Sequence, residues 1–139
     1  MQTALVIVRA LSLPASVIEV DWSVCEVLSE RFLAGSGRPA PQGSAAEWIP
    51  ETLEDAHARY AAALEAIADR HAGCSCILVV THGECVRRAV TRLEPRALVY
   101  EVRHCGWVAA RREREPHGGW GLWQLGQAPD GACCISWAV

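Results

Sequence analysis

The residues best suited to chemistry in this sequence are Thr81, His82 and Gly83, which stand between two predicted elements. Residues 76–80 before them form an apolar, mostly β-branched run, which predicts a strand buried on both faces. From Glu84 onward the apolar residues recur at helical spacing, which predicts a helix. His82 is therefore expected at a helix N-terminus, where free backbone N–H groups and the helix dipole favour anions, phosphate above all.

His82 has two interpretations in this position. It could donate a hydrogen bond to a phosphoryl oxygen, helped by the backbone N–H groups at Gly83 and beyond. The alternative is a histidine hydrogen-bonded at a strand end, and the helix N-terminus leads us to favour the anion site. We interpret Glu84 as a first-turn acid that complements the dipole, and Arg87 and Arg88 as the outer face of the helix.

The seven cysteines are an odd number. Cys76, Cys85 and Cys105 lie in stretches predicted to be core, so we interpret them as small buried apolar residues in a reducing compartment. A metal site is the sharper alternative, because Cys74-x-Cys76, His82-x-x-Cys85 and His104-Cys105 could converge. The paired C-x-x-C spacing of structural zinc sites does not occur. We therefore predict no metal and no cofactor.

Length and charge narrow the classes of protein. The 139 residues, 51% of them hydrophobic, favour one domain with its own core. A net charge of -3, without a basic face, argues against a nucleic-acid partner. No run approaches the roughly 20 apolar residues of a membrane helix, and Arg9 interrupts the apolar N-terminal stretch, unlike a signal peptide. We expect a cytoplasmic protein with no membrane partner, and we leave its oligomeric state open.

The remaining elements follow from the same periodicities. Helices are predicted over residues 2–11 and 52–72, and strands over residues 17–20, 97–102 (with Leu98, Tyr100 and Val102 alternating), 105–110 and 120–125, the last two as a hairpin. Residues 34–44 are predicted to be a surface loop. The long helix is a crossover that makes the strands at 17–20 and 76–80 parallel. This order predicts an α/β domain over residues 1–126 and a tail, 127–139, which either adds a strand at 135–139 or stays loose.

Four segments together resemble the histidine phosphatase superfamily, also called phosphoglycerate mutase-like. The strand-Thr81-His82-Gly83-Glu84-helix sequence is similar to the family's second histidine motif. Gln2-Thr3-Ala4 is similar to the Q-T-A that opens an early helix of the family. Residues 20–26 resemble a strand followed by a short segment that ends in an acid, here Glu26. With the long helix and the later strand pair, the resemblance covers most of residues 2–126.

The resemblance implies a three-layer α/β fold, in which helices flank a mixed sheet. It implies hydrolysis of phosphate monoesters, or phosphomutase chemistry, through a phosphohistidine and without a metal. In this pattern Glu26 takes the place of the proton donor to the leaving oxygen, with a solvated surface glutamate as an equal alternative. His82 and Gly83 would bind the phosphoryl group of a phosphorylated small molecule or a phosphoprotein.

The sequence departs from the family at its hallmark, an Arg-His-Gly at the end of the first strand that supplies the nucleophilic histidine. No Arg-His-Gly occurs in the 139 residues. We therefore expect a truncated domain that lacks the central strand beside residues 76–80, and turnover that is absent or very weak. Two alternatives stay open: a non-catalytic phosphate-binding or regulatory module, and a partial gene model of an active phosphatase.

Overall fold

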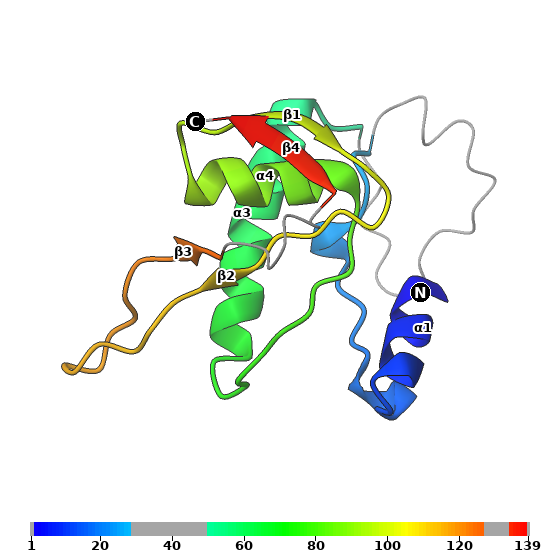
Figure 1. Ribbon diagram of the computed structural model, residues 1–139, viewed down its shortest axis with the longest axis vertical. Coiled ribbons are helices and arrows are strands. Elements are labelled where there is room, and N and C mark those ends of the chain that lie inside the picture. The colour runs from blue at the N-terminus through cyan, green and yellow to red at the C-terminus, as the bar shows by residue number, and fades with distance from the viewer. Residues whose placement is uncertain (1, 29–49, 127–133, 139) are drawn as a thin grey trace.

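The described part of the chain contains three α-helices, two short 3-10 turns (η) and two short antiparallel ribbons (Figure 1). The computed structural model describes residues 2–28, 50–126 and 134–138. Its elements are α1 (Gln2–Ala10), η1 (Ala15–Val17), η2 (Trp22–Val24), α3 (Leu53–Arg70), α4 (Gly83–Leu93), β1 (Leu98–Val102), β2 (Ala110–Arg111), β3 (Gln124–Leu125) and β4 (Ile135–Ala138). The predicted α/β class is confirmed. The predicted loop at 34–44 lies outside the described residues.

Helix α3 begins where its sequence provides a capping box. The Thr52 hydroxyl accepts from the Asp55 N–H at 3.1 Å, and the Asp55 carboxylate accepts from the Thr52 N–H at 3.1 Å. These bonds satisfy two backbone donors that the first turn leaves free. The predicted helix over residues 52–72 is confirmed, with ends shifted by one or two residues.

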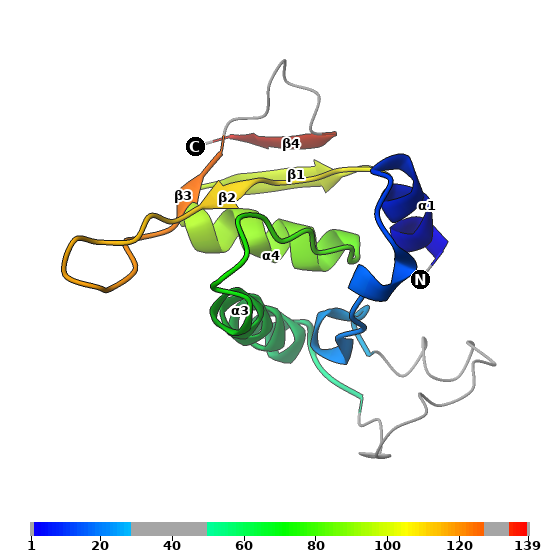
Figure 2. The same cartoon turned by 90° about the horizontal axis from the view of Figure 1, so that it is seen from below.

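Helix α4 lies between α3 and the β1–β4 ribbon (Figure 2). Its residue Cys85 packs into a core cluster with Tyr60 of α3 and Val24 of η2, and each is at most 8% exposed. On the other side Val90 packs with Val99 of β1 in a second cluster. Apolar residues of α4 lie on two sides of the helix, so α4 packs against α3 on one side and against β1 on the other.

Strand β1 confirms the strand predicted at 97–102 and pairs antiparallel with β4. The open alternative for residues 135–139 is thus decided in favour of a strand over Ile135–Ala138. The buried residue of β1 is Val99, whereas Leu98 and Tyr100 are exposed. The predicted alternation of Leu98, Tyr100 and Val102 therefore does not mark the core face. The side chains of Leu98 and Tyr100 are exposed to solvent, and Val99 packs into the core instead.

The predicted hairpin forms, but its strands are shorter than expected. Only Ala110–Arg111 and Gln124–Leu125 pair as β2 and β3, with one more bridge between Arg114 and Trp120. Residues 105–109 are not a strand, which corrects the prediction of a second strand over 105–110. Cys105 adopts φ 62°, a left-handed conformation that a continuous strand does not accommodate.

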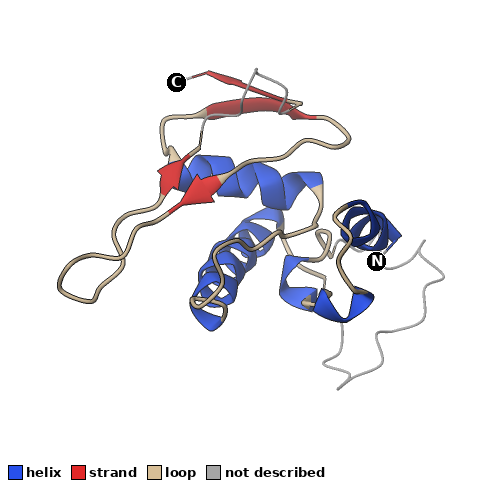
Figure 3. Cartoon of the chain, turned by 60° about the horizontal axis from the view of Figure 1, so that its bottom comes forward, coloured by secondary structure: helices blue, strands red, loops and turns tan. Residues whose placement is uncertain are grey.

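The two strands predicted at 17–20 and 76–80 do not form within the described residues. Val17 ends the turn η1, residues 18–20 and 76–80 have no regular secondary structure, and Figure 3 draws the connection between α3 and α4 as loop. Leu78 is 62% exposed and Val20 is 50% exposed, so neither stretch is buried on both faces. The predicted parallel pair is therefore wrong here: both described ribbons are antiparallel. Their composition favours a strand, but no described segment pairs with them.

The cysteine prediction holds for one residue of three. Cys85 is buried in the core, whereas Cys76 and Cys105 are exposed because the strands predicted to bury them do not form. Burial raises the pKa of the Cys85 thiol, as expected for a thiol that packs as an apolar residue.

Candidate functional site

Helix α4 begins at Gly83, one residue after His82, as the sequence predicted. His82 is the N-cap residue, with extended backbone angles of φ −107° and ψ 164°. Its own side chain makes no capping hydrogen bond, so it does not occupy the first-turn N–H groups of α4. Those donors and the positive end of the helix dipole remain available for an anion.

Glu26 lies directly against His82. Its Oε2 is 2.9 Å from Nδ1 of His82, and the two side chains are 36% and 47% exposed. The residues are 56 positions apart in the chain, so tertiary packing brings them together. The site therefore places an acid and an imidazole in contact, with both side chains partly exposed.

The turn η2 delivers Glu26 to this position. The Asp21 carboxylate caps η2 by accepting from the Ser23 N–H at 2.9 Å. The hydrogen bond from Ser23 keeps the pKa of Asp21 below its ordinary value. At the end of η2 the Val24 carbonyl accepts from the Thr81 hydroxyl. This last bond joins the turn before Glu26 to the residue before His82.

A second chain of contacts runs beside the site, and sequence analysis missed it. Nε2 of His57 is 3.2 Å from Oε2 of Glu84, whose Oε1 accepts from Nε of Arg87 at 3.2 Å. Arg87 also donates to the Val99 carbonyl. Arg87 therefore lies against β1 rather than on an outer face, and Glu84 has side-chain partners besides the dipole. The pairing of His57 with Glu84 leaves no periodic signal in the sequence.

Arg88 also departs from the expected outer face. Its Nε is buried and has no hydrogen-bond partner among the described residues.

No three His, Cys, Asp or Glu side chains of the described residues gather to hold a metal ion. The absence of a metal and of a cofactor stays a prediction.

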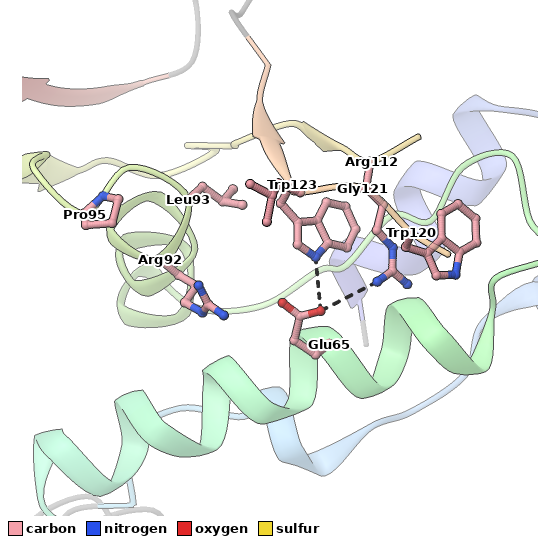
Figure 4. Close-up of a pocket in the computed structure, with 9 residues that line it drawn as sticks. Glu65, Arg92, Leu93, Pro95, Arg112, Trp120, Gly121 and Trp123 are labelled. Carbon is pink, nitrogen blue, oxygen red and sulfur yellow. Dashed lines mark hydrogen bonds and ion pairs between the residues drawn. The ribbon is translucent and has the colours of Figure 1, made fainter. Parts of the chain in front are cut away.

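A separate pocket of about 350 Å³ lies between α3, the end of α4 and the hairpin. Figure 4 shows Arg112 beside Trp120 and Trp123, with Glu65 below them. The Arg112 guanidinium stacks 4.7 Å and 4.8 Å from the two ring centres, and Nε1 of Trp123 donates to Glu65 at 3.1 Å. The stacking joins the two arms of the hairpin, and the bond from Trp123 to Glu65 fastens the hairpin to α3. The pocket lining contains neither His82 nor Glu26.

Comparison with known proteins places the chain in a family. The model of the histidine phosphatase superfamily (branch 1) matches residues 1–115. The chain belongs to the histidine phosphatase superfamily. The matched range includes Glu26, His82 and Gly83, the predicted site residues of this histidine phosphatase domain. Neither the curated proteins nor the solved structures gave a match.

The described helices carry no membrane-spanning segment. None of them is both long enough and apolar enough to cross a bilayer.

Proposed function

We propose that the His82 site of this histidine phosphatase domain binds the phosphoryl group of a phosphate monoester, and that these 139 residues turn it over weakly or not at all. Membership of the superfamily supports the family-level reaction, phosphatase or phosphomutase. The observation that carries the proposal is the contact of His82 Nδ1 with Glu26 at the N-terminus of α4.

His82 supplies the hydrogen bond that distinguishes this site from a bare helix end. When its imidazole is protonated, both ring nitrogens donate. Nδ1 then donates to the Glu26 carboxylate, and Nε2 donates to a phosphoryl oxygen. Such bonds between ionised groups are about twice as strong as neutral ones. The backbone N–H of Gly83 and those that follow it stabilise the remaining charge.

The contact of Glu26 with His82 supports the role of proton donor that the sequence resemblance implies for Glu26. In hydrolysis of a phosphate monoester, the bond from phosphorus to the leaving oxygen breaks, and that oxygen takes up a proton. A protonated Glu26 carboxyl could supply it, because its side chain is accessible as well as hydrogen-bonded. In its ionised form the same carboxylate fixes the orientation of the His82 ring.

Transfer of the phosphoryl group also needs a nucleophile in line with the leaving oxygen. In this family that nucleophile is the histidine of Arg-His-Gly, a tripeptide that the 139 residues do not contain. Arg87, which follows the site on α4, is engaged by Glu84 and by the Val99 carbonyl. We therefore propose binding without efficient transfer, which also accommodates the alternative of a regulatory phosphate-binding module.

Titration with inorganic phosphate, followed by ¹H–¹⁵N NMR, tests the binding. We expect saturable shifts of the Gly83 and Glu84 amides, with a dissociation constant on the order of millimolar, about −4 kcal/mol. His82→Ala should abolish them. His117→Ala is the matched control, because His117 is also followed by glycine but lies in the hairpin turn. Absence of saturable shifts at millimolar phosphate would contradict the proposed site.

An assay with an aryl phosphate tests the second half of the proposal. We expect no turnover above the rate of the His82→Ala variant. Robust hydrolysis that this substitution removes would instead identify an active phosphatase and overturn the proposal of weak turnover.

A further inference from the structure

The backbone that carries Glu26 has no regular secondary structure of its own. It leaves η2 at Val24 and continues without helix or strand to residue 28. An irregular segment has no ladder of hydrogen bonds to fix it, so its carbonyl groups need other donors. Whatever supplies these donors also sets where the Glu26 carboxylate can reach.

Arg59 of α3 supplies most of these donors. Its NH1 nitrogen donates to the Ser23 carbonyl at 2.7 Å and to the Cys25 carbonyl at 3.4 Å. Its NH2 nitrogen donates to the carbonyl of Glu26 itself at 3.4 Å. A guanidinium holds these donors in one rigid plane, so the Arg59 side chain alone contacts three carbonyls of residues 23–26.

Glu51 links Arg59 to the backbone of Leu28, which follows Glu26 in the chain. Its carboxylate accepts from Nε of Arg59 at 3.0 Å and also from NH2. The same carboxylate accepts from the Leu28 N–H at 2.9 Å, and the Glu51 N–H donates to the Leu28 carbonyl at 3.0 Å. Glu26 is therefore held between two anchored points, one before it and one after it.

We propose that Arg59, together with Glu51, is a positioning residue that holds Glu26 against His82. The proposal rests on the proposed function, because it gives Glu26 and His82 a shared role. Reacting groups need close alignment, and small displacements are costly in rate. The competing explanation is that Arg59 and Glu51 form a purely structural ion pair. In that case, replacing Arg59 in a chain that still folds would leave the environment of the His82 ring unchanged.

The test uses the full 139-residue chain and the ring-nitrogen NMR signals of its histidines, which report on the proton and hydrogen bond at each nitrogen. We expect Glu26→Gln to shift the His82 signals. Arg59→Gln should shift them in the same way, and the double variant should add no further shift, since residues acting through one contact are not additive. Unfolding measured on every variant confirms that each is folded.

Two further variants keep the test decisive. Arg96→Gln is the control, because Arg96 pairs with Glu94 and donates to none of the carbonyls of residues 23–26. It should leave the His82 ring signals unchanged. Arg59→Lys retains the charge but not the planar fork, and it replaces Arg59→Gln if that variant does not fold. We expect it to move the His82 signals towards the Glu26→Gln values.

The outcomes separate this inference from the proposed function. Unchanged His82 signals in folded Arg59→Gln or Arg59→Lys would overturn the positioning role. A full shift in these variants, with no binding of inorganic phosphate to the unaltered chain, would retain the positioning role and reject the phosphoryl site.

Discussion

At the residue scale, the hydrogen bonds from Arg59 favour the ionised form of Glu51. The hydrogen bonds from Arg59 keep the pKa of its carboxyl below the ordinary value near 4.5. A group with a lowered folded-state pKa stabilises the fold above its unfolded pKa, and this contribution disappears as the pH falls through the folded value. We predict that the stability advantage of the unaltered chain over Glu51→Gln is constant at neutral pH and shrinks below about pH 4.5.

Urea unfolding between pH 3 and pH 7 measures this dependence. Glu54→Gln is the control, since Glu54 also stands at the start of α3 but has no ion pair among those identified in the described residues. Its difference from the unaltered chain should depend less on pH. An advantage of the unaltered chain over Glu51→Gln that persists to pH 3 would contradict the role of the ionised carboxylate.

Some residues in and around the candidate site could be identified from the sequence, and others could not. His82 and Glu26 could be predicted, because one stands at a change of periodicity and the other in a segment resembling a family. Arg59, Glu51 and His57 could not be assigned roles. Arg59 meets the carbonyls of residues 23–26 only because α3 packs against η2, and His57 meets Glu84 only because α3 packs against α4. Glu51 meets Leu28 across 23 positions of the chain.

At the scale of elements, the start of α3 depends on its cap. Thr52→Ala removes a side-chain acceptor that an exposed first turn needs, which typically costs about 1 kcal/mol. For a domain of this size we predict a fall in Tm of about 4 °C. Thr52→Ser retains the hydroxyl and should restore most of the loss. Thermal unfolding followed by circular dichroism measures both.

Thr91→Ala is the control for the cap. Thr91 lies inside α4, and its hydroxyl donates to the Arg88 carbonyl one turn earlier. Alanine has the higher helix propensity at such a site, so its Tm should change little or rise. Equal losses for Thr52→Ala and Thr91→Ala would show that the cap is not the cause.

Tyr60 joins α3 to the segment before Glu26. Its ring is fully buried, and burial raises the pKa of its hydroxyl to about 12. The hydroxyl donates to the Cys25 carbonyl at 2.9 Å. Tyr60→Phe should therefore lower the free energy of unfolding by about 1 kcal/mol, as measured by urea unfolding. Tyr100→Phe, at a 62% exposed residue, should change it little, and an equal loss there would contradict this account.

The elements that sequence reasoning misplaced share one physical cause. Residues 17–20 and 76–80 are rich in β-branched side chains, which fit a pleated surface. A strand also requires a neighbour whose backbone groups complete its ladder, and nothing in a single stretch of sequence reveals whether that neighbour is present. Helices α3 and α4 were predicted well, because their hydrogen bonds lie within the element.

At the scale of the whole molecule, the apolar surface is unevenly distributed. Ile77, Leu78 and Val80 lie in the stretch before α4 that has no regular secondary structure, and they are 39%, 62% and 39% exposed. The described residues make no backbone hydrogen bonds to this stretch. Such an unpaired, apolar backbone is a template for pairing with another chain, so we expect the isolated 139 residues to self-associate as their concentration rises.

Leu78→Glu tests this expectation. A charge on the solvent side of such a stretch opposes edge-to-edge pairing, so sedimentation velocity should show less association than in the unaltered chain. The fold itself should keep its stability, because Leu78 is 62% exposed. Leu122→Glu is the matched control, since Leu122 is 90% exposed but stands in the hairpin, away from the unpaired stretch. If both variants reduced association equally, net charge rather than the unpaired backbone at residues 77–80 would be the cause.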